Sequence, residues 1–302
     1  MQGEGPALSY LCVKVVKPLY RIVKKKPLNP TVTWMDVEAP AVARKAEPGQ
    51  FIILRVDENG ERIPLTVAGF DREAGTVTII FQIVGATTEK LNRKQEGEFI
   101  QDFVGPLGVP THTQDLEKVA VVGGGVGCAI AYPVAKKLYQ QGCQIHSIVG
   151  FRSKELVILE EEFAAASTKF CKMSDDGSWG EKGLVTDALR RLIESGERYD
   201  RVIAIGPLIM MKFVTKLTKE FNIPTTVSMN PIMIDGTGMC GGCRLSLIQN
   251  GQRVTKFACV DGPDFDGFEV DFDEAMARSA MYRDFERHAH EEACNLFRGG
   301  KA

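Results

Sequence analysis

Residues 118–127 read KVAVVGGGVG, an apolar run that passes into four glycines, and this stretch decides the fold. A continuous apolar run of this kind is typical of a buried parallel strand. The glycines allow a tight turn into a helix, which we expect over residues 128–141, ended by Gly142. A strand, a glycine loop and a helix in this order predict the first unit of a doubly wound α/β sheet.

The sequence downstream continues the same alternation as far as Asn230. Short apolar runs predict further strands, and amphipathic stretches between them predict helices. The strands are expected at 144–150, 168–173, 201–206 and 225–230, and the helices near 156–166, over 183–195 and from Leu208 onward. We therefore predict a parallel α/β domain over residues 113–230.

The sequence upstream of the glycine loop has a different pattern. Runs of β-branched residues are separated by turn residues such as Pro48-Gly49 and Asn59-Gly60. Short strands at this spacing predict an antiparallel sandwich or barrel, here over residues 20–112. The expected strands include 31–37, 51–56, 65–70 and 76–84.

Three further segments complete the division of the chain. Residues 231–272 hold clustered cysteines and a predicted hairpin at 245–257, with Asn250-Gly251 at its turn. Apolar residues at helical spacing predict a helix over 274–297, within a C-terminal segment of residues 273–302. Residues 1–19 form an N-terminal extension.

The composition excludes several classes of function. Lys and Arg number 37 against 39 Asp and Glu, so the formal net charge of −2 offers no basic field for nucleic acid. No apolar run reaches the roughly 18–20 residues of a membrane-spanning helix, and the first residues do not resemble a signal peptide. We expect a cytoplasmic protein that binds neither nucleic acid nor membrane.

The sharpest motif is Asp235-x4-Cys240-x2-Cys243-x15-Cys259. Thiolates suit the iron of iron–sulfur clusters, and the plant-type [2Fe–2S] spacing is C-x4-C-x2-C…C, here with Asp235 in the first position. The interleaved glycines allow the backbone to wrap closely around a cluster. A zinc site with three sulfurs and one carboxylate is the alternative, although structural zinc sites usually have two short cysteine knuckles and this region has one.

A second motif, Arg62-x-Pro64-x-Thr66, stands at the start of an expected strand. An arginine can hold a pyrophosphate through two hydrogen bonds, and a threonine hydroxyl can bond a flavin. The segment Gly85-Ala86-Thr87-Thr88 strengthens this interpretation, although it can also be a plain helix start capped by Thr87 or Thr88.

The third motif is the glycine loop itself. Backbone N–H groups of Gly123, Gly124, Gly125 and Gly127, at the start of a helix, attract a pyrophosphate. The loop departs from G-x-G-x-x-G, since Cys128 takes the place of the third glycine, so a simple tight turn is the alternative. Gly206-Pro207 ends a later strand at the edge of the sheet where a nicotinamide can bind.

In this order the motifs resemble those of the ferredoxin-reductase-like flavoproteins. Within them, the chain resembles the family of small subunits of NADH-dependent reduced ferredoxin:NADP⁺ oxidoreductase. The resemblance covers residues 20–273. It rests on MDVEAP (35–40), PGQFIILRVDENGERIPLT (48–66), LVILEEEF (156–163), DGTGMCGGCR (235–244) and CVDGPDFDG (259–267).

The resemblance implies three cofactor sites and no catalytic side chain. FAD is expected against Arg62, Pro64, Leu65 and Thr66, with Gln82, Ile83, Thr87 and Thr88 on its other side. NAD(H) is expected at the glycine loop and at Gly206 and Pro207, and the [2Fe–2S] cluster on Asp235, Cys240, Cys243 and Cys259. Arg152, Ser153 and Lys154 lie where an adenosine ribose is expected and would suit NADP, whereas the resemblance implies NADH.

The resemblance also implies a partner. It is a larger subunit, similar to the small subunit of glutamate synthase, with its own flavin and [4Fe–4S] clusters, through which ferredoxin and NADP(H) are reached by electron bifurcation. One alternative is the electron-transfer subunit of dihydroorotate dehydrogenase, which normally has four cysteine ligands where this chain has Asp235. A second, non-catalytic alternative is a zinc-stabilised scaffold protein.

Overall fold

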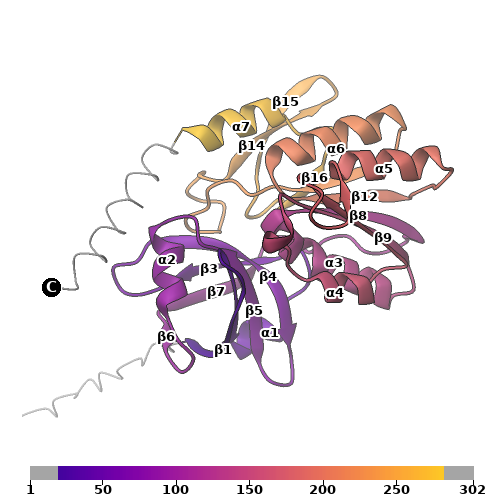
Figure 1. Cartoon of the computed structure of the whole chain (residues 1–302). Coiled ribbons are helices and arrows are strands. Elements are labelled where there is room, and N and C mark those ends of the chain that lie inside the picture. Colours follow the sequence, from indigo (N-terminus) through magenta and orange to yellow (C-terminus); the bar gives the residue numbers. More distant parts are fainter. Residues whose placement is uncertain (1–19, 282–302) are drawn as a thin grey trace, which may run out of the picture.

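The structure, a computed structural model, describes residues 20–281. Residues 1–19 and the expected helix beyond residue 281 lie outside this range. In Figure 1 an antiparallel barrel lies beside an α/β domain, and a smaller C-terminal part lies along the top of both. No helix within the described range is long and apolar enough to cross a membrane.

Strand pairing closes the N-terminal sheet almost completely into a barrel. Its order is β6-β1-β2-β5-β4-β3-β7. Strands β6 and β7 are separated only by Gln101, and they pair with β1 and β3 at the two edges of the sheet. This part comprises β1 (Tyr20–Asn29), β2 (Val32–Glu38), α1 (Pro40–Ala43), β3 (Phe51–Arg55), β4 (Arg62–Asp71), β5 (Thr76–Gln82), α2 (Ala86–Arg93), β6 (Phe99–Ile100) and β7 (Asp102–Leu107). One nearly continuous strand thus pairs with both edge strands of the sheet and closes it. The N-terminal domain is therefore a barrel and not a sandwich.

The barrel is held by an apolar interior with a period of two residues. On β5, Val77, Ile79 and Phe81 are buried in one cluster with Ile52 and Leu54 of β3. Successive strand residues point to opposite faces, so this alternation fixes the register of the strands.

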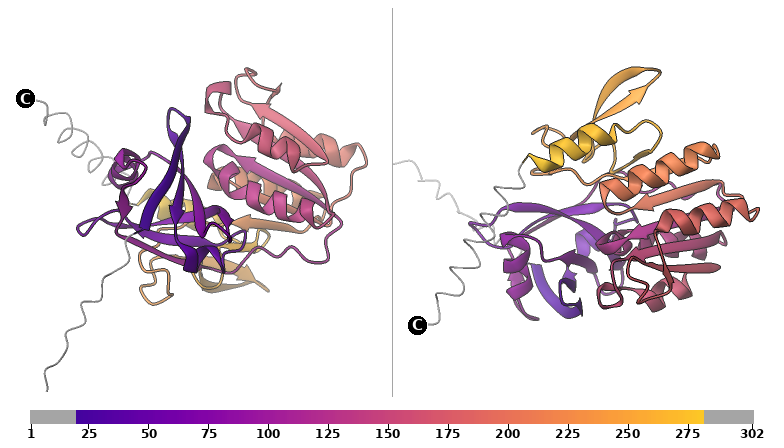
Figure 2. Two further views of the ribbon diagram at one scale, coloured as in Figure 1. Left: turned by 90° about the horizontal axis from the view of Figure 1, so that it is seen from below. Right: turned by 45° about the horizontal axis from the view of Figure 1, so that its top comes forward.

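The second sheet is parallel over six strands, in the order β11-β10-β9-β8-β12-β13. Helices cover both faces, as Figure 2 shows from two directions. The elements are β8 (Lys118–Gly124), α3 (Cys128–Gln140), β9 (Gln144–Phe151), α4 (Glu160–Ala165), β10 (Lys169–Ser174), β11 (Glu181–Lys182), α5 (Val185–Glu194), β12 (Arg201–Ile205), α6 (Leu208–Glu220) and β13 (Thr225–Ser228). The strand order reverses between β8 and β12, the place where open α/β sheets bind their ligands.

One expected helix begins later than the sequence suggested. Residues 154–156 form a 3-10 turn, and α4 starts only at Glu160. Leu159 has a left-handed backbone with φ +58°, which a right-handed helix cannot include. The expected start near Leu156 is therefore wrong, and the end at Ala165 is close to the expected one.

The C-terminal part combines the predicted hairpin with an addition to the parallel sheet. Strands β14 (Arg244–Gln249) and β15 (Gln252–Phe257) turn at Asn250 and Gly251, both with positive φ, which confirms the Asn-Gly turn. Strand β16 (Asp264–Asp266) pairs antiparallel with β13, and α7 (Phe272–Ala280) follows it. This part is therefore joined to the α/β sheet by strand pairing.

Candidate cofactor-binding sites

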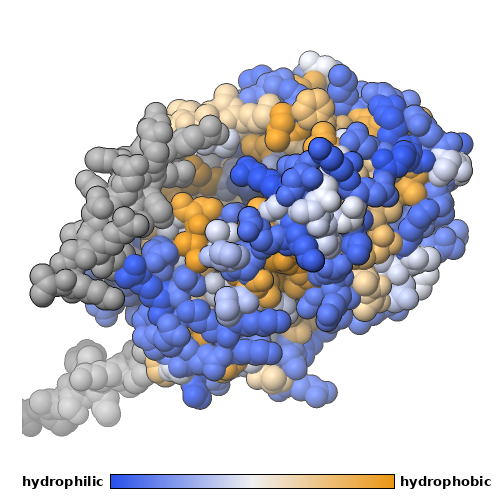
Figure 3. Space-filling model, in the orientation of Figure 1, coloured by the Kyte–Doolittle hydropathy of each residue, from blue (hydrophilic) through white to orange (hydrophobic). Residues whose placement is uncertain are grey.

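A cleft of about 720 Å³ opens at the strand reversal, between the α/β domain and the barrel. Its volume lies within the ~300–1,000 Å³ of small-molecule sites. It gathers Gly124, Gly125, Gly127, Arg152, Gly206, Pro207 and Gln82 from the predicted set, together with the unpredicted Asn29, Thr31, Asp175, Met210 and Asn230. Figure 3 shows apolar surface around the hollow in the middle of this face.

The glycine loop has the geometry of a phosphate cradle. Gly125 has φ +55°, and a Cβ there would meet no atom within 4 Å, so its backbone is open to a ligand. A Cβ on Gly127 would lie 2.6 Å from Cα of Gly206, so these two glycines pack backbone to backbone. The N-terminus of α3 follows directly, and its N–H groups favour an anion. The loop therefore fits a dinucleotide pyrophosphate.

Two residues near the cradle do not belong to it: Gly123 is buried behind the loop, and Met210 comes from the neighbouring helix α6. Gly123 is buried, and a Cβ there would lie 2.9 Å from Sγ of Cys128, so this glycine serves close strand–helix packing. Met210 on α6 lines the cleft and lies against Gly206. Only its place at the carboxyl edge of β12, one turn into the helix, could have indicated Met210 from sequence.

Two polar residues at the far end of the cleft lie near the expected ribose position. Arg152 follows β9 and Asp175 follows β10, at neighbouring strand ends. Asp175 is a residue that sequence reasoning missed. The signal for it was its position directly after a predicted strand, where ligand-binding residues of parallel sheets gather.

The expected flavin residues lie on the adjacent barrel strands β4 and β5 and at the start of α2, and among them Leu65 and Ile83 pack against the barrel core. Pro64, Leu65 and Thr66 of β4 are half-buried, and Arg62 at the start of the strand is exposed. Arg62 makes no ion pair with any residue of the described part, so its guanidinium is free to bind a phosphate. Gln82 ends the neighbouring strand β5, and the half-buried Ile83 follows it.

The start of α2 only partly matches the flavin interpretation. Thr88 accepts hydrogen bonds from the backbone N–H groups of Val84 and Gly85, both at 3.0 Å. Thr87 donates its hydroxyl to the carboxylate of Glu61 at 3.0 Å. Thr88 therefore caps the start of the helix, as the alternative interpretation held. Thr87 remains close to the Arg62 motif, because it bonds Glu61, the residue before Arg62.

The β14–β15 hairpin brings two of the three clustered cysteines into contact. Cys243 precedes the hairpin and Cys259 follows it, and their sulfurs lie 3.1 Å apart in a buried position. Burial, with the Cys243 thiol beside it, raises the pKa of Cys259 to about 12. Two buried thiolates need a metal to supply positive charge, so this pair fits an iron–sulfur cluster.

Asp235 and Cys240 form a separate pair on the loop that precedes the hairpin. The carboxylate of Asp235 accepts the backbone N–H groups of Thr237 at 2.9 Å and Cys240 at 3.1 Å, which lowers its pKa. Cys240 is exposed. In residues 20–281 no three His, Cys, Asp or Glu side chains stand close enough to hold a metal ion. The four expected ligands are therefore arranged as two neighbouring pairs.

The cluster loop rests directly on the barrel. Gly236, with φ +74°, lies against Leu107 of β7 and Ile53 of β3, and a Cβ there would lie 2.7 Å from Cδ1 of Leu107. Only glycine allows this approach. The loop that carries Asp235 is thus placed at the end of the barrel, on the side where β3 lies between β4 and β7.

Comparison with known proteins agrees with this arrangement. Residues 230–271 match the iron–sulfur cluster binding domain of dihydroorotate dehydrogenase B, and residues 121–216 match the oxidoreductase NAD-binding domain. The fold and these sites define an NAD(H)-dependent electron-transfer oxidoreductase subunit of the ferredoxin-reductase-like class.

Three relatives narrow this class. The chain is 46% identical to a "dihydroorotate dehydrogenase B (NAD(+)), electron transfer subunit homolog" of Thermotoga maritima, over 90% of this chain and 95% of the relative. It is 51% identical to an uncharacterised protein of Clostridium beijerinckii, over 91% and 94%. The chain belongs to the family of dihydroorotate dehydrogenase B electron-transfer subunits and their homologues.

The third relative is a solved structure of NADH-dependent reduced ferredoxin-NADP oxidoreductase, studied for flavin-based electron bifurcation. It is 45% identical, with a TM-score of 0.85, over 91% of this chain and 98% of that chain. The resemblance, fold class and enzyme class expected from the sequence are thereby confirmed. The expected cofactors, FAD, an iron–sulfur cluster and NAD(H), are confirmed with them.

Proposed function

We propose that the chain passes electrons between NAD(H) and a larger subunit with its own flavin and [4Fe–4S] clusters, in a bifurcating complex that reaches ferredoxin and NADP(H). The observation that carries this proposal is the 45% identity to the solved NADH-dependent reduced ferredoxin-NADP oxidoreductase, at nearly full coverage of both chains. The family itself consists of electron-transfer subunits and their homologues. The proposal adds the kind of partner and the bifurcating complex.

Each domain then has one task. Residues 20–112 hold FAD through Arg62, Pro64, Leu65, Thr66, Gln82, Ile83, Thr87 and Thr88. Residues 113–230 hold NAD(H) through Gly124 to Gly127, Gly206 and Pro207, while Gly123 packs the loop against α3. Residues 231–272 hold a [2Fe–2S] cluster through Asp235, Cys240, Cys243 and Cys259. The free Arg62, the open backbone of Gly125 and the buried Cys243–Cys259 pair support these assignments.

The order of the sites follows from electron counting. NAD(H) exchanges two electrons as a hydride and an iron–sulfur cluster accepts one, so a flavin that can do both belongs between them. The chain's own work is placement. The glycine loop holds the dinucleotide in the cleft beside Gln82, and the Gly236 loop places the cluster ligands on the same barrel.

The partner docks, in this proposal, beside the exposed Cys240. Met239 is 88% exposed, and Ile234 and Val260 are about half exposed, so apolar side chains surround the cluster loop. Exposed apolar groups of this kind mark interaction sites, and a partner there would exclude water from the cluster. Cysteine ligands also favour a reducing compartment, and we place the protein in the cytoplasm.

The cofactor preference that we propose is NADH. Asp175 lines the end of the cleft beside Arg152, and its carboxylate would repel the 2′-phosphate of NADPH. Arg152 can instead bind the dinucleotide pyrophosphate or remain solvated. This assignment follows the resemblance and adds a residue of the structure to it.

Anaerobic co-purification tests the proposal. The protein, produced with iron and sulfide available, should carry flavin and iron–sulfur absorption, oxidise NADH, and bind a larger flavin and [4Fe–4S] protein from the same cells. Preparations that contain zinc and neither flavin nor iron would contradict it and would restore the scaffold alternative.

A second candidate is the electron-transfer subunit of a dihydroorotate dehydrogenase. The match of residues 230–271 to that enzyme's cluster domain favours it. Asp235 discriminates between the two, because a carboxylate ligand should give the cluster a different potential from four thiolates. Asp235→Cys should shift the EPR g-values and the midpoint potential if Asp235 is a ligand. Co-purification of an FMN protein that oxidises dihydroorotate would establish the second candidate.

A further inference from the structure

The linker between the barrel and the α/β domain is hydrogen-bonded both to the barrel and to the cluster segment. Thr111 donates its backbone N–H to Pro48 of the barrel at 2.9 Å. Two residues earlier, Val109 donates its N–H to Gly262 of the cluster segment at 2.7 Å. A stretch of three residues therefore joins the barrel to the chain that follows Cys259.

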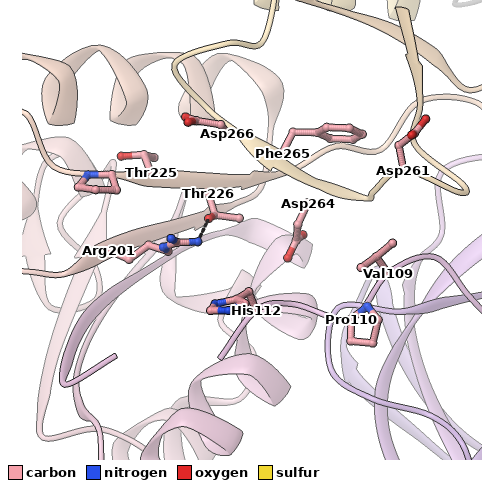
Figure 4. A pocket seen from close by; sticks show the side chains of 11 residues that line it. Val109, Pro110, His112, Arg201, Thr225, Thr226, Asp261, Asp264, Phe265 and Asp266 are labelled. Carbon is pink, nitrogen blue, oxygen red and sulfur yellow. Dashed lines mark hydrogen bonds between the residues drawn. The ribbon is translucent and has the colours of Figure 1, made fainter. Parts of the chain in front are cut away.

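A side-chain hydrogen bond closes this junction. The hydroxyl of Thr111 donates to Oδ2 of Asp264 at 2.6 Å, across 153 residues of sequence. Figure 4 shows Asp264 pointing from β16 toward the linker residues Val109 and Pro110, into a cavity of about 240 Å³. Oδ1 of Asp264 is buried and has no hydrogen-bond partner within the described part of the chain.

The carboxyl of Asp264 is buried, and its removal from water is unfavourable unless a hydrogen bond such as that from Thr111 compensates for it. Removal from water raises the pKa of Asp264, and the hydrogen bonds from Thr111 and Ser228 only partly offset that effect. If Thr111 were removed, the buried carboxyl of Asp264 would lose a hydrogen bond that water cannot replace, which would destabilise the junction more than the same loss at an exposed carboxyl. Ser228 ends β13 beside the nucleotide cleft, so Asp264 touches both the linker and the α/β sheet.

Close packing at Gly108 holds the linker against the cluster segment on the barrel side of the junction. A Cβ on Gly108 would lie 3.0 Å from both the carbonyl oxygen of Gly262 and Cδ of Pro263, and 2.9 Å from the ring of Phe51. Phe51 pairs with Leu107, the residue that also supports Gly236. The two arms of the cluster segment, before Cys240 and after Cys259, thus rest on the same end of the barrel.

We propose that the hydrogen bond between Thr111 and Asp264 positions the cluster segment against the flavin barrel and so sets the rate of electron transfer between flavin and cluster. Both are positioning residues, because neither contacts the expected cofactors. The inference rests on the proposed function for its electron-transfer step. The junction itself is a feature of the chain alone.

Four variants separate the bond from the shape of the side chains. Thr111→Val removes the hydroxyl at nearly constant volume, and Asp264→Leu removes the acceptor. Thr111→Ser and Asp264→Asn keep a donor and an acceptor and should rescue the bond. Thr78→Val is the matched control, because it removes another threonine–aspartate hydrogen bond, with Asp36 at 2.6 Å, on barrel strands that do not line this cavity.

The kinetic experiment is anaerobic rapid mixing of the reconstituted protein with NADH. Flavin bleaching reports hydride transfer, and freeze-quench EPR reports cluster reduction. In Thr111→Val and Asp264→Leu we expect cluster reduction to slow several-fold, because the rate of electron tunnelling falls exponentially as the distance between flavin and cluster grows. Flavin bleaching, iron content and cluster g-values should remain those of the wild type.

Hydrogen exchange on the apoprotein provides a readout without cofactors. The amides of Val109 and Thr111 should exchange faster in Thr111→Val and Asp264→Leu, and at the wild-type rate in both rescue variants and in Thr78→Val. Wild-type cluster reduction in Thr111→Val, equal slowing of both kinetic steps, or no rescue by Thr111→Ser would overturn the inference. Wild-type protein that binds no flavin or iron would instead refute the proposed function, and the exchange experiment would still test the junction.

Discussion

Gly127 and Gly206 meet backbone to backbone at the floor of the nucleotide cleft. A Cβ on Gly127 would lie 2.6 Å from Cα of Gly206 and equally close to the carbonyl oxygen of Ile205. The glycine loop after β8 and the strand end of β12 therefore reach a common surface. The two loops that flank the point of strand reversal are locked in one position before any ligand binds.

Gly127→Ala should separate these loops and weaken NADH binding. Overpacking of about 1–3 kcal/mol is expected, and the loops must move apart to relieve it. NADH affinity, measured by anaerobic titration, should fall at least about tenfold, the equivalent of 1.4 kcal/mol. Gly69→Ala is the control, since a Cβ there makes only ordinary contacts at 3.4 Å with Thr78. Unchanged affinity in Gly127→Ala would contradict the assigned role of the loop.

Cys259→Ser should abolish cluster assembly, whereas Cys171→Ser should not. Cys259 lies 3.1 Å from Cys243 in the buried pair, and Cys171 lies half-buried on β10, away from that pair. A serine hydroxyl is a poor replacement for a soft thiolate. Iron and acid-labile sulfide per protein are the measurements. Full iron content in Cys259→Ser would exclude that cysteine as a ligand.

Asp175→Asn should relax the preference for NADH. Removal of one negative charge at the end of the cleft lowers the repulsion of a 2′-phosphate, and about tenfold better relative use of NADPH corresponds to about 1.4 kcal/mol. The ratio of kcat/KM for the two dinucleotides checks this. Asp176→Asn, which alters the adjacent exposed carboxylate that binds Ser178, is the control. A ratio that does not move would place Asp175 away from the ribose.

An ion pair across the domain boundary makes stability depend on pH. Lys137 on α3 donates to Glu47 of the barrel at 2.7 Å, and this hydrogen bond holds the pKa of Glu47 below its ordinary value. A carboxyl with a lowered pKa contributes stability above its unfolded pKa and loses it as the pH falls through the folded pKa.

Lys137→Met should therefore lower the free energy of unfolding near neutral pH and lose its effect in acid. The expected loss is about 0.5–1 kcal/mol, because the pair is partly exposed. Urea unfolding over a pH series measures it, with the exposed Lys216→Met on α6 as control. A difference from wild type that persists below the lowered pKa of Glu47 would show that packing, not charge, links the domains.

Local chemistry made much of this architecture predictable. The apolar run before Gly123 and the Asn250-Gly251 turn each specify one backbone conformation, and both formed as expected. The start of α4 was missed because nothing in sequence announces a left-handed leucine at Leu159. The contact of Thr111 with Asp264 was beyond sequence reasoning, since it joins residues 153 positions apart and exists only after three parts of the chain have packed.

In the proposed function, NADH and iron exchange electrons through one protein-bound flavin. Freeze-quench EPR of the anaerobic, iron-loaded protein mixed with NADH measures this directly. We expect the flavin to bleach first and a reduced [2Fe–2S] signal then to rise as the flavin reoxidises. A bleached flavin beside a cluster that stays oxidised, or a cluster that NADH reduces in flavin-free protein, would contradict it.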